Sequence, residues 1–185
     1  MLTATALQLD IEIPWEAHPG SFTLTLRNSS SPFESVQPID LLDYAPTFER
    51  SGLPGDANRP PVVAHQDFRG LVTFSDPAAS GETVHLYMTG LGDVQPRPFT
   101  GQTSSFLAWA NQRPLCWLIS SFAQTQTPAP VLFAGIAPGL IGIYQVDVTI
   151  PASYPSSVVT MSCVDQGSSQ GLSGDFASFY VVKGM

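Results

Sequence analysis

The sequence predicts an all-β protein built around an immunoglobulin-like β-sandwich, and three observations support this fold class. The 185 residues include 17 prolines and 15 glycines, which divide the chain into many short apolar runs. Several of these runs alternate apolar and polar residues with a period of two, as strands that bury one face do. No segment has the spacing of a long amphipathic helix, which a parallel α/β fold would require between its strands.

Three strands are expected in the N-terminal part of the chain. Residues 7–13, LQLDIEI, place leucine and isoleucine on one face and direct Asp10 and Glu12 toward solvent. Residues 21–28, SFTLTLRN, repeat this alternation with phenylalanine and leucine inward. A proline interrupts the third run, SVQPIDLLDY at 35–44, which predicts an edge strand or a bulge.

The breaker-rich segment ERSGLPGDANRPP at residues 49–61 marks the expected domain boundary, as a linker or a long surface loop. Eight short apolar runs follow it, the number that an immunoglobulin-like sandwich needs. We therefore expect a partial immunoglobulin-like repeat at 1–48 and a complete sandwich domain at 62–185.

A faint internal repeat supports this organisation. LQLDIEIPWE at 7–16 and YQVDVTIPAS at 144–153 share one pattern of apolar, polar, aspartate and proline positions. The first copy has only about 45 residues, where a full sandwich needs about 100. Its three strands should leave an apolar face or an open edge, which packs on residues 62–182, pairs with another chain as a homodimer, or is covered by further sequence.

Three longer strings carry a family resemblance: VVAHQDFRGLVTFSDPA at 62–78, GETVHLYMTGLGDVQP at 81–96 and LFAGIAPGLIGIYQVDVTIP at 132–151. In this order they resemble the uncharacterised Solibacter-type C-terminal domain of secreted or surface proteins of acidobacteria, which has IPT/TIG-like, immunoglobulin-like character. The resemblance implies a sandwich fold and an exported setting, and the family has no established activity or catalytic residues to carry over. The sequence departs from the family pattern at 104–127 and in its two cysteines.

Those cysteines, Cys116 and Cys163, each lie in an apolar, strand-like run. The two strands could face each other across a sheet. In an exported protein the cysteines would then form one disulfide, and the alternative is a pair of buried thiols.

Charge and hydropathy argue against several partners. The net charge is -8 and Lys183 is the single lysine, so the clustered cations that bind nucleic acid or anionic membranes are missing. No run of 18 apolar residues predicts a membrane-inserted helix. The first residues, MLTATALQLD, show neither the basic nor the apolar region of a signal peptide.

Sites for metals and for catalysis find little support. No metal-ligand spacing connects the histidines, and no G-x-S-x-G elbow is present. Loop aspartates could bind calcium, but they form no D-x-D-x-D-G cluster, so ordinary Asx turns are favoured. The histidines are His18, His65 and His85, and the aspartates are Asp40, Asp43, Asp56, Asp67 and Asp93. We expect no cofactor and no enzyme, although a hydrolase with loop carboxylates is a third option.

Aromatic residues suggest recognition of a protein or glycan partner. Trp15 follows a proline in a turn and Trp109 lies in the atypical 104–127 segment, so both are candidates for exposed binding residues, whereas Trp117 is expected in the core. The sequence therefore predicts a non-catalytic β-sandwich module of a secreted or cell-surface protein, with a role in adhesion, spacing or attachment. The alternative is a carbohydrate-binding accessory module that stacks sugar rings on Trp15 or Trp109.

Overall fold

The computed structural model describes residues 3–5, 8–27, 34–52, 56, 58–120, 125–154, 156–164 and 175–182. These residues form strands and connections, with no helix among them. The strands are β1 (Thr3–Ala4), β2 (Leu9–Asp10), β3 (Gly20–Arg27), β4 (Glu34–Leu41), β5 (Thr47–Phe48), β6 (Val63–Ala64), β7 (Thr83–Thr89), β8 (Val94–Gln95), β9 (Trp109–Ala110), β10 (Leu115–Ser120), β11 (Thr125–Ala129), β12 (Val131–Ile136), β13 (Tyr144–Thr149), β14 (Val158–Val164) and β15 (Phe176–Tyr180).

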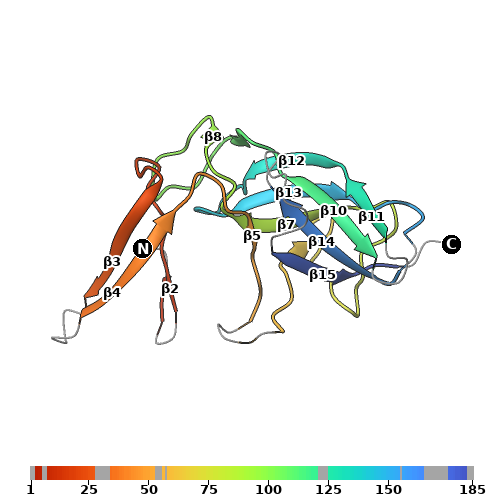
Figure 1. The fold of residues 1–185 in the computed structure, drawn as a ribbon. Coiled ribbons are helices and arrows are strands. Elements are labelled where there is room, and N and C mark those ends of the chain that lie inside the picture. The colour runs from red at the N-terminus through yellow and green to blue at the C-terminus, as the bar shows by residue number, and fades with distance from the viewer. Residues whose placement is uncertain are drawn as a thin grey trace.

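Two antiparallel sheets make up the body of the molecule (Figure 1). The larger sheet has the order β5-β7-β13-β12-β9-β8, with β6 also paired to β7, and the smaller has the order β11-β10-β14-β15. Buried side chains from both sheets form one hydrophobic cluster. The all-β prediction is therefore confirmed, with antiparallel sheets that are consistent with a β-sandwich.

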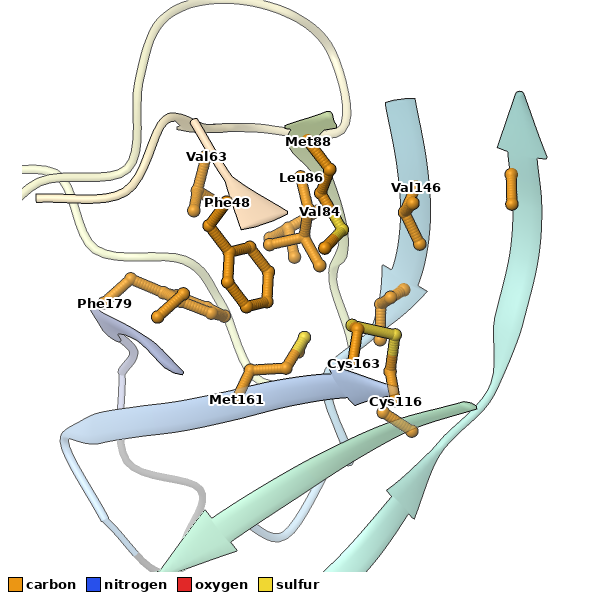
Figure 2. Close-up of a cluster of buried hydrophobic side chains, with 14 of the residues drawn as sticks. Phe48, Val63, Val84, Leu86, Met88, Cys116, Val146, Met161, Cys163 and Phe179 are labelled. Atoms are coloured by element: carbon orange, nitrogen blue, oxygen red, sulfur yellow. A yellow bond between two sulfur atoms is a disulfide. The ribbon is translucent and has the colours of Figure 1, made fainter. Parts of the chain in front are cut away.

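Alternation along the strands builds the core (Figure 2). In β7, Val84, Leu86 and Met88 are fully buried, and in the smaller sheet Met161 of β14 lies in the same cluster. Phe48 also enters this cluster, because β5 pairs with β7 of the larger sheet. The predicted N-terminal repeat, 1–48, thus ends in a residue that belongs to the core of the sandwich.

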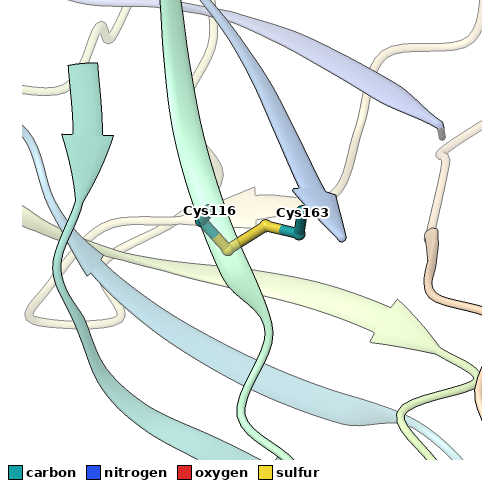
Figure 3. Close-up of a disulfide and its surroundings, with 2 residues drawn as sticks. All are labelled: Cys116 and Cys163. Carbon is teal, nitrogen blue, oxygen red and sulfur yellow. A yellow bond between two sulfur atoms is a disulfide. The ribbon is translucent and has the colours of Figure 1, made fainter. Parts of the chain in front are cut away.

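Cys116 of β10 and Cys163 of β14 form a disulfide (Figure 3). They are direct partners in the antiparallel register of these neighbouring strands, with their Cα atoms 4.1 Å apart. Both side chains are buried. The disulfide therefore crosslinks two strands within one sheet, whereas the conserved disulfide of antibody domains joins the two sheets.

The N-terminal strands stand apart from the sandwich (Figure 1). β3 and β4 form a two-stranded antiparallel sheet of their own, and β1 and β2 form another. β4 contains Pro38 and lies at an edge, as predicted. Its neighbour β3 was expected to bury its apolar face, but Phe22 is 47% exposed and Leu26 is 37% exposed, because no second sheet covers them among the described residues.

The first alternating run has its faces reversed relative to the prediction. Leu9, Ile11 and Ile13 are each close to 40% exposed, whereas Glu12 is half-buried. Glu12 Oε2 accepts a hydrogen bond from the backbone N–H of Gly101 at 2.6 Å, which attaches this segment to a loop of the sandwich. The polar face is thus the docked face, and the apolar face remains exposed because nothing described packs on it.

Hydrogen bonds join the two described ends of the 49–61 segment. Ser51 N donates to the carbonyl of Pro60 at 3.0 Å, and Val62 N donates to the carbonyl of Glu49 at 2.7 Å. Arg50 anchors the same ends, because its guanidinium lies 2.5 Å from Asp175 Oδ1. These contacts hold the two ends of the segment close together beside the sandwich.

Candidate functional site

An open groove of about 830 Å³ separates the N-terminal segment from the sandwich. Its walls combine apolar side chains with the carboxylates of Asp10 and Glu49. The pKa of Glu49 is raised, first by burial and then by the negative charge of Asp10, while Arg59 lowers it in part. Burial and nearby carboxylates likewise raise the pKa of Tyr144, whose hydroxyl donates to the carbonyl of Gly92 at the groove wall. The groove is acidic and favours cationic or hydrogen-bond-donating ligands.

Trp15 lines this groove but does not present an open ring face. Its backbone N–H donates to Thr100 Oγ1 at 3.1 Å, which fixes the turn against the sandwich. The guanidinium carbon of Arg97 lies over the indole at 5.9 Å from the ring centroid. The indole Nε1 is buried and has no hydrogen-bond partner among the described residues. Trp15 is therefore half-buried against the core and covered on one face by a cation.

Trp109 is the more accessible tryptophan. It is 38% exposed in β9, with its ring edge-to-face against Phe133 at a centroid distance of 4.7 Å. Gly135 makes this arrangement possible, since a Cβ there would lie 2.1 Å from the carbonyl oxygen of Ala108 and 2.9 Å from the Phe133 ring. The guanidinium of Arg113 lies 5.3 Å from the Trp109 ring centroid. These side chains form an aromatic cluster on the outer face of the larger sheet.

Trp117 is not a core residue, in contrast to the prediction. It is half-buried in β10, where its neighbours Cys116 and Leu118 point into the core. Strand alternation then directs the indole to the outer face. Trp117 lines a shallow second hollow with residues on both sides of the β11–β12 connection.

A histidine–aspartate pair lies on the outer face of the larger sheet. His85 of β7 and Asp147 of β13 are direct partners in the strand register, and His85 Nδ1 is 2.6 Å from Asp147 Oδ1. Gln145 Nε2 donates to the same carboxylate oxygen at 2.8 Å. Such a pair orients the base of many catalytic triads. Whether it can act here depends on the second ring nitrogen.

That second nitrogen is occupied by the protein itself. His85 Nε2 lies 3.1 Å from the carbonyl oxygen of Gln66, in the loop that follows β6. The ring of Phe68 stacks on His85 with a centroid distance of 4.0 Å and an interplanar angle of 2°. Phe68 has φ of 55°, which is uncommon for a residue with a large side chain. Both ring nitrogens thus face oxygen acceptors and the stacked ring covers His85, so this histidine has no free nitrogen to offer a substrate.

His65 organises a second buried cluster at the same loop. It is fully buried, with Nδ1 2.8 Å from Glu82 Oε1 and Nε2 3.2 Å from the carbonyl oxygen of Asp76. Arg69 Nη2 lies 2.8 Å from Nδ1 and also contacts Asp76 Oδ1 at 3.3 Å. These groups tie residues 65–76 into a compact loop over the sheet.

Glu82 is the anion that holds this loop. Burial raises the pKa of its carboxyl. Hydrogen bonds from the backbone N–H groups of Ala79 and Gln66 and from the ring of His65 together lower the pKa by more, so the net shift is downward. The corresponding distances are 2.7 Å from Ala79 N to Oε2 and 3.1 Å from Gln66 N to Oε1. The charged carboxylate is therefore the form that the folded protein favours.

Three of the aspartates considered for calcium, Asp56, Asp67 and Asp93, are used in local contacts. Asp56 Oδ1 accepts from Asn58 N at 2.9 Å, and Asp67 Oδ1 accepts from Arg69 N at 3.2 Å, which are Asx-turn contacts. Asp93 pairs with Arg97 at 2.8 Å. Within the described ranges, no group of three or more histidine, cysteine, aspartate or glutamate side chains could hold a metal ion.

The structure thus separates the two predicted binding residues, because Trp15 lies in the groove and Trp109 lies on the outer face of the sheet. The hydrogen-bonded clusters around His65 and His85, in which each histidine fastens a loop to the larger sheet, were not predicted from the sequence. A usable signal was present, since His85 and Asp147 are each flanked on both sides by strongly apolar residues of their strands. Their pairing depends on the register between β7 and β13, which a single sequence does not specify.

Comparisons with protein-family models, with curated proteins and with solved structures found no match for this chain. No helix in the described part of the chain has the length and apolarity that a membrane span requires.

Proposed function

We propose that this protein is a non-catalytic β-sandwich module of a secreted or cell-surface protein, and that it serves adhesion, spacing or attachment. One observation carries the proposal: the most enzyme-like pair, His85 and Asp147, is closed off by the carbonyl of Gln66 and the ring of Phe68. A general base needs a free lone pair within hydrogen-bond reach of its substrate. This pair instead fastens a loop to the sheet.

The exported setting is supported by the disulfide between Cys116 and Cys163, since such bonds persist in oxidising compartments. The resemblance to secreted acidobacterial domains points in the same direction. A rigid sandwich with variable loops also suits a spacer or attachment module, because loops carry recognition while the sheets hold them.

Two measurements test the proposal. Antibody labelling of intact cells and of culture medium should detect the protein, whereas detection after lysis alone would contradict an exported role. The purified protein should also lack turnover on nitrophenyl esters, nitrophenyl glycosides and casein. Turnover by the wild type that His85→Gln abolishes, with the fold retained by circular dichroism, would refute the non-catalytic assignment.

A carbohydrate-binding role is the second candidate, and the exposure of Trp109 favours it. Gly135 pairs with Trp109 on one side and with Gln145 on the other, but Gln145 is buried and donates to Asp147, so the exposed indole is the group that a sugar ring could reach. Exposed rings stack on sugars while nearby polar groups bind hydroxyls. On a glycan array, Trp109→Ala should abolish binding and Trp15→Ala should preserve it, since Trp15 is the more buried of the two and packs against the core. Binding that survives substitution of both tryptophans would rule out ring stacking.

A further inference from the structure

The β3–β4 hairpin has an unpaired edge that is long for a soluble protein. β3 runs from Gly20 to Arg27, and within the described residues it pairs with β4 alone. An isolated two-stranded hairpin is at best marginally stable in water, and an open edge displays a row of unpaired backbone groups. The hairpin therefore requires a further strand or sheet for stability.

The two faces of the hairpin differ in chemistry. Phe22 of β3 lies opposite Ile39 of β4, on a face that also carries Leu24 and Leu26. The other face of β3 carries Ser21, Thr23, Thr25 and Arg27, as strand alternation requires. Any strand added at the edge must repeat this division, because a shift by one residue would place its polar side chains on the apolar face.

The β3 edge is better suited to pairing than the β4 edge. β4 contains Pro38, which has no backbone N–H and is a common device for protecting an edge. β3 contains no proline. In Figure 1, β3 lies on the side of the hairpin away from the sandwich, so this edge is open to a partner.

We propose that two copies of this chain pair through their β3 edges, antiparallel and around a two-fold axis at Leu24. In this register Phe22 lies opposite Leu26 of the second copy and Thr23 lies opposite Thr25 of the second copy. Apolar residues then meet apolar residues, and cross-strand threonine pairs form on the polar face. The result is a continuous four-stranded sheet, β4-β3-β3-β4, with one apolar face.

Charge complementarity selects this register. It places Arg27 of one copy opposite Ser21 of the other, and Ser21 Oγ donates to Asp40 Oδ1 of its own hairpin at 2.6 Å. The guanidinium, which pairs with Glu34 of its own hairpin at 2.9 Å, thus also approaches Asp40 across the interface, at both ends of the paired strands. A shift by two residues in one direction would set Leu26 opposite Gly20 and remove Arg27 from the paired segment. The opposite shift would move Arg27 from Ser21 to Thr23 and leave Phe22 without a partner in β3, so each shift loses an apolar contact.

The experiment introduces charged side chains of either sign on the polar face of β3. In Thr23→Glu/Thr25→Glu the introduced glutamates face each other across the two-fold axis, and in Thr23→Lys/Thr25→Lys the introduced lysines do. Within each hairpin, Thr23 and Thr25 lie opposite the uncharged Pro38 and Val36. The control, Val36→Glu, places a charge on the same face one strand further from the proposed interface and keeps Pro38, which protects the β4 edge.

Sedimentation equilibrium should show the wild type at twice the 19.8 kDa monomer mass. Each charged double variant should dimerise at least about 10-fold more weakly, since like charges directly opposite one another are destabilising. An equimolar mixture of the two should restore a heterodimer, while the control keeps the wild-type dimer. Unchanged melting of the sandwich would show that every variant is folded.

Three results would overturn the proposal. The wild type could sediment as a monomer at 100 µM or above, the control could weaken the dimer as much as the Thr23 and Thr25 substitutions do, or the mixture could fail to restore association. The last two would indicate a dimer that forms through another surface.

Discussion

Removal of the disulfide gives the most quantitative test of the fold. Cys116 and Cys163 are separated by 47 residues, and both are buried in the smaller sheet. The loop-entropy relation gives about 4 kcal/mol for a closed loop of this length, through the restriction of the unfolded chain. Replacing both cysteines with alanine also removes buried sulfur atoms and adds about 1 kcal/mol through imperfect packing. We expect Cys116→Ala/Cys163→Ala to lose about 5 kcal/mol of unfolding free energy.

Urea denaturation followed by tryptophan fluorescence measures this loss. The free energies of unfolding in water should be compared by linear extrapolation, because the uncrosslinked chain exposes more surface and its m-value should rise. Wild-type protein unfolded in a phosphine reductant should approach the double variant, while the double variant should not respond to reductant. A difference below about 1 kcal/mol between wild type and variant would refute the argument, since the crosslink would then not restrict the unfolded chain as assumed.

Four further substitutions test the hydrogen bonds of Glu82 to the His65 loop, two glycine connections and the core. Glu82→Gln should cost about 1–3 kcal/mol at pH 7 by weakening charged hydrogen bonds around His65. Because the pKa of Glu82 is lowered from 4.5, its contribution is complete above pH 4.5 and disappears as the pH falls through the folded-state value, so the wild type and the variant should converge in acid urea titrations. Gly90→Ala should lower the unfolding free energy by at least about 3 kcal/mol, since a Cβ there would lie 2.0 Å from a backbone oxygen. Gly101→Ala, at a similar positive φ with open space around it, should lower it by about 1–2 kcal/mol. Equal shifts of the melting temperature in the two variants would contradict this. Leu118→Ala, at a fully buried position, should cost about 2–5 kcal/mol in the same urea assay, and a loss below 1 kcal/mol would contradict its place in the core.

The longer strands were predictable because their side-chain alternation reports a buried face. SFTLTLRN contains β3, and the apolar runs after residue 61 contain β7, β10, β13 and β14 close to their predicted positions. GLVTFS, at residues 70–75, is one of the eight apolar runs expected to form a strand, but it contributes only an isolated bridge between Ala64 and Leu71. The two-residue strands β8 and β9 escaped prediction because so short a segment has no measurable periodicity. Their pairing is set by contacts between residues that are distant in sequence.

The candidate site was less predictable than the fold. Alternation identifies two different faces of a strand but does not say which face meets the rest of the protein. Asp10 and Glu12 illustrate this point, since Glu12 docks on Gly101 while the apolar face is exposed. The hydrogen-bonded cluster around His85 depends likewise on strand register and on the loop that carries Phe68.

The exposed apolar residues of LQLDIEIP, at 7–14, can be compared directly with those of the similar segment YQVDVTIP, at 144–151, inside the sandwich. In YQVDVTIP, Val146, Val148 and Ile150 are fully buried because β13 lies between β7 and β12 and beneath the smaller sheet. In LQLDIEIP, Leu9 and Ile11 hold the positions of Val146 and Val148, yet both are exposed. Equivalent local patterns therefore produce opposite burial, and the difference lies in the neighbouring strands. Pairing through the β3 edge leaves β2 outside the interface, so protection from hydrogen exchange should rise with association along Gly20–Arg27 and stay unchanged at Leu9–Asp10.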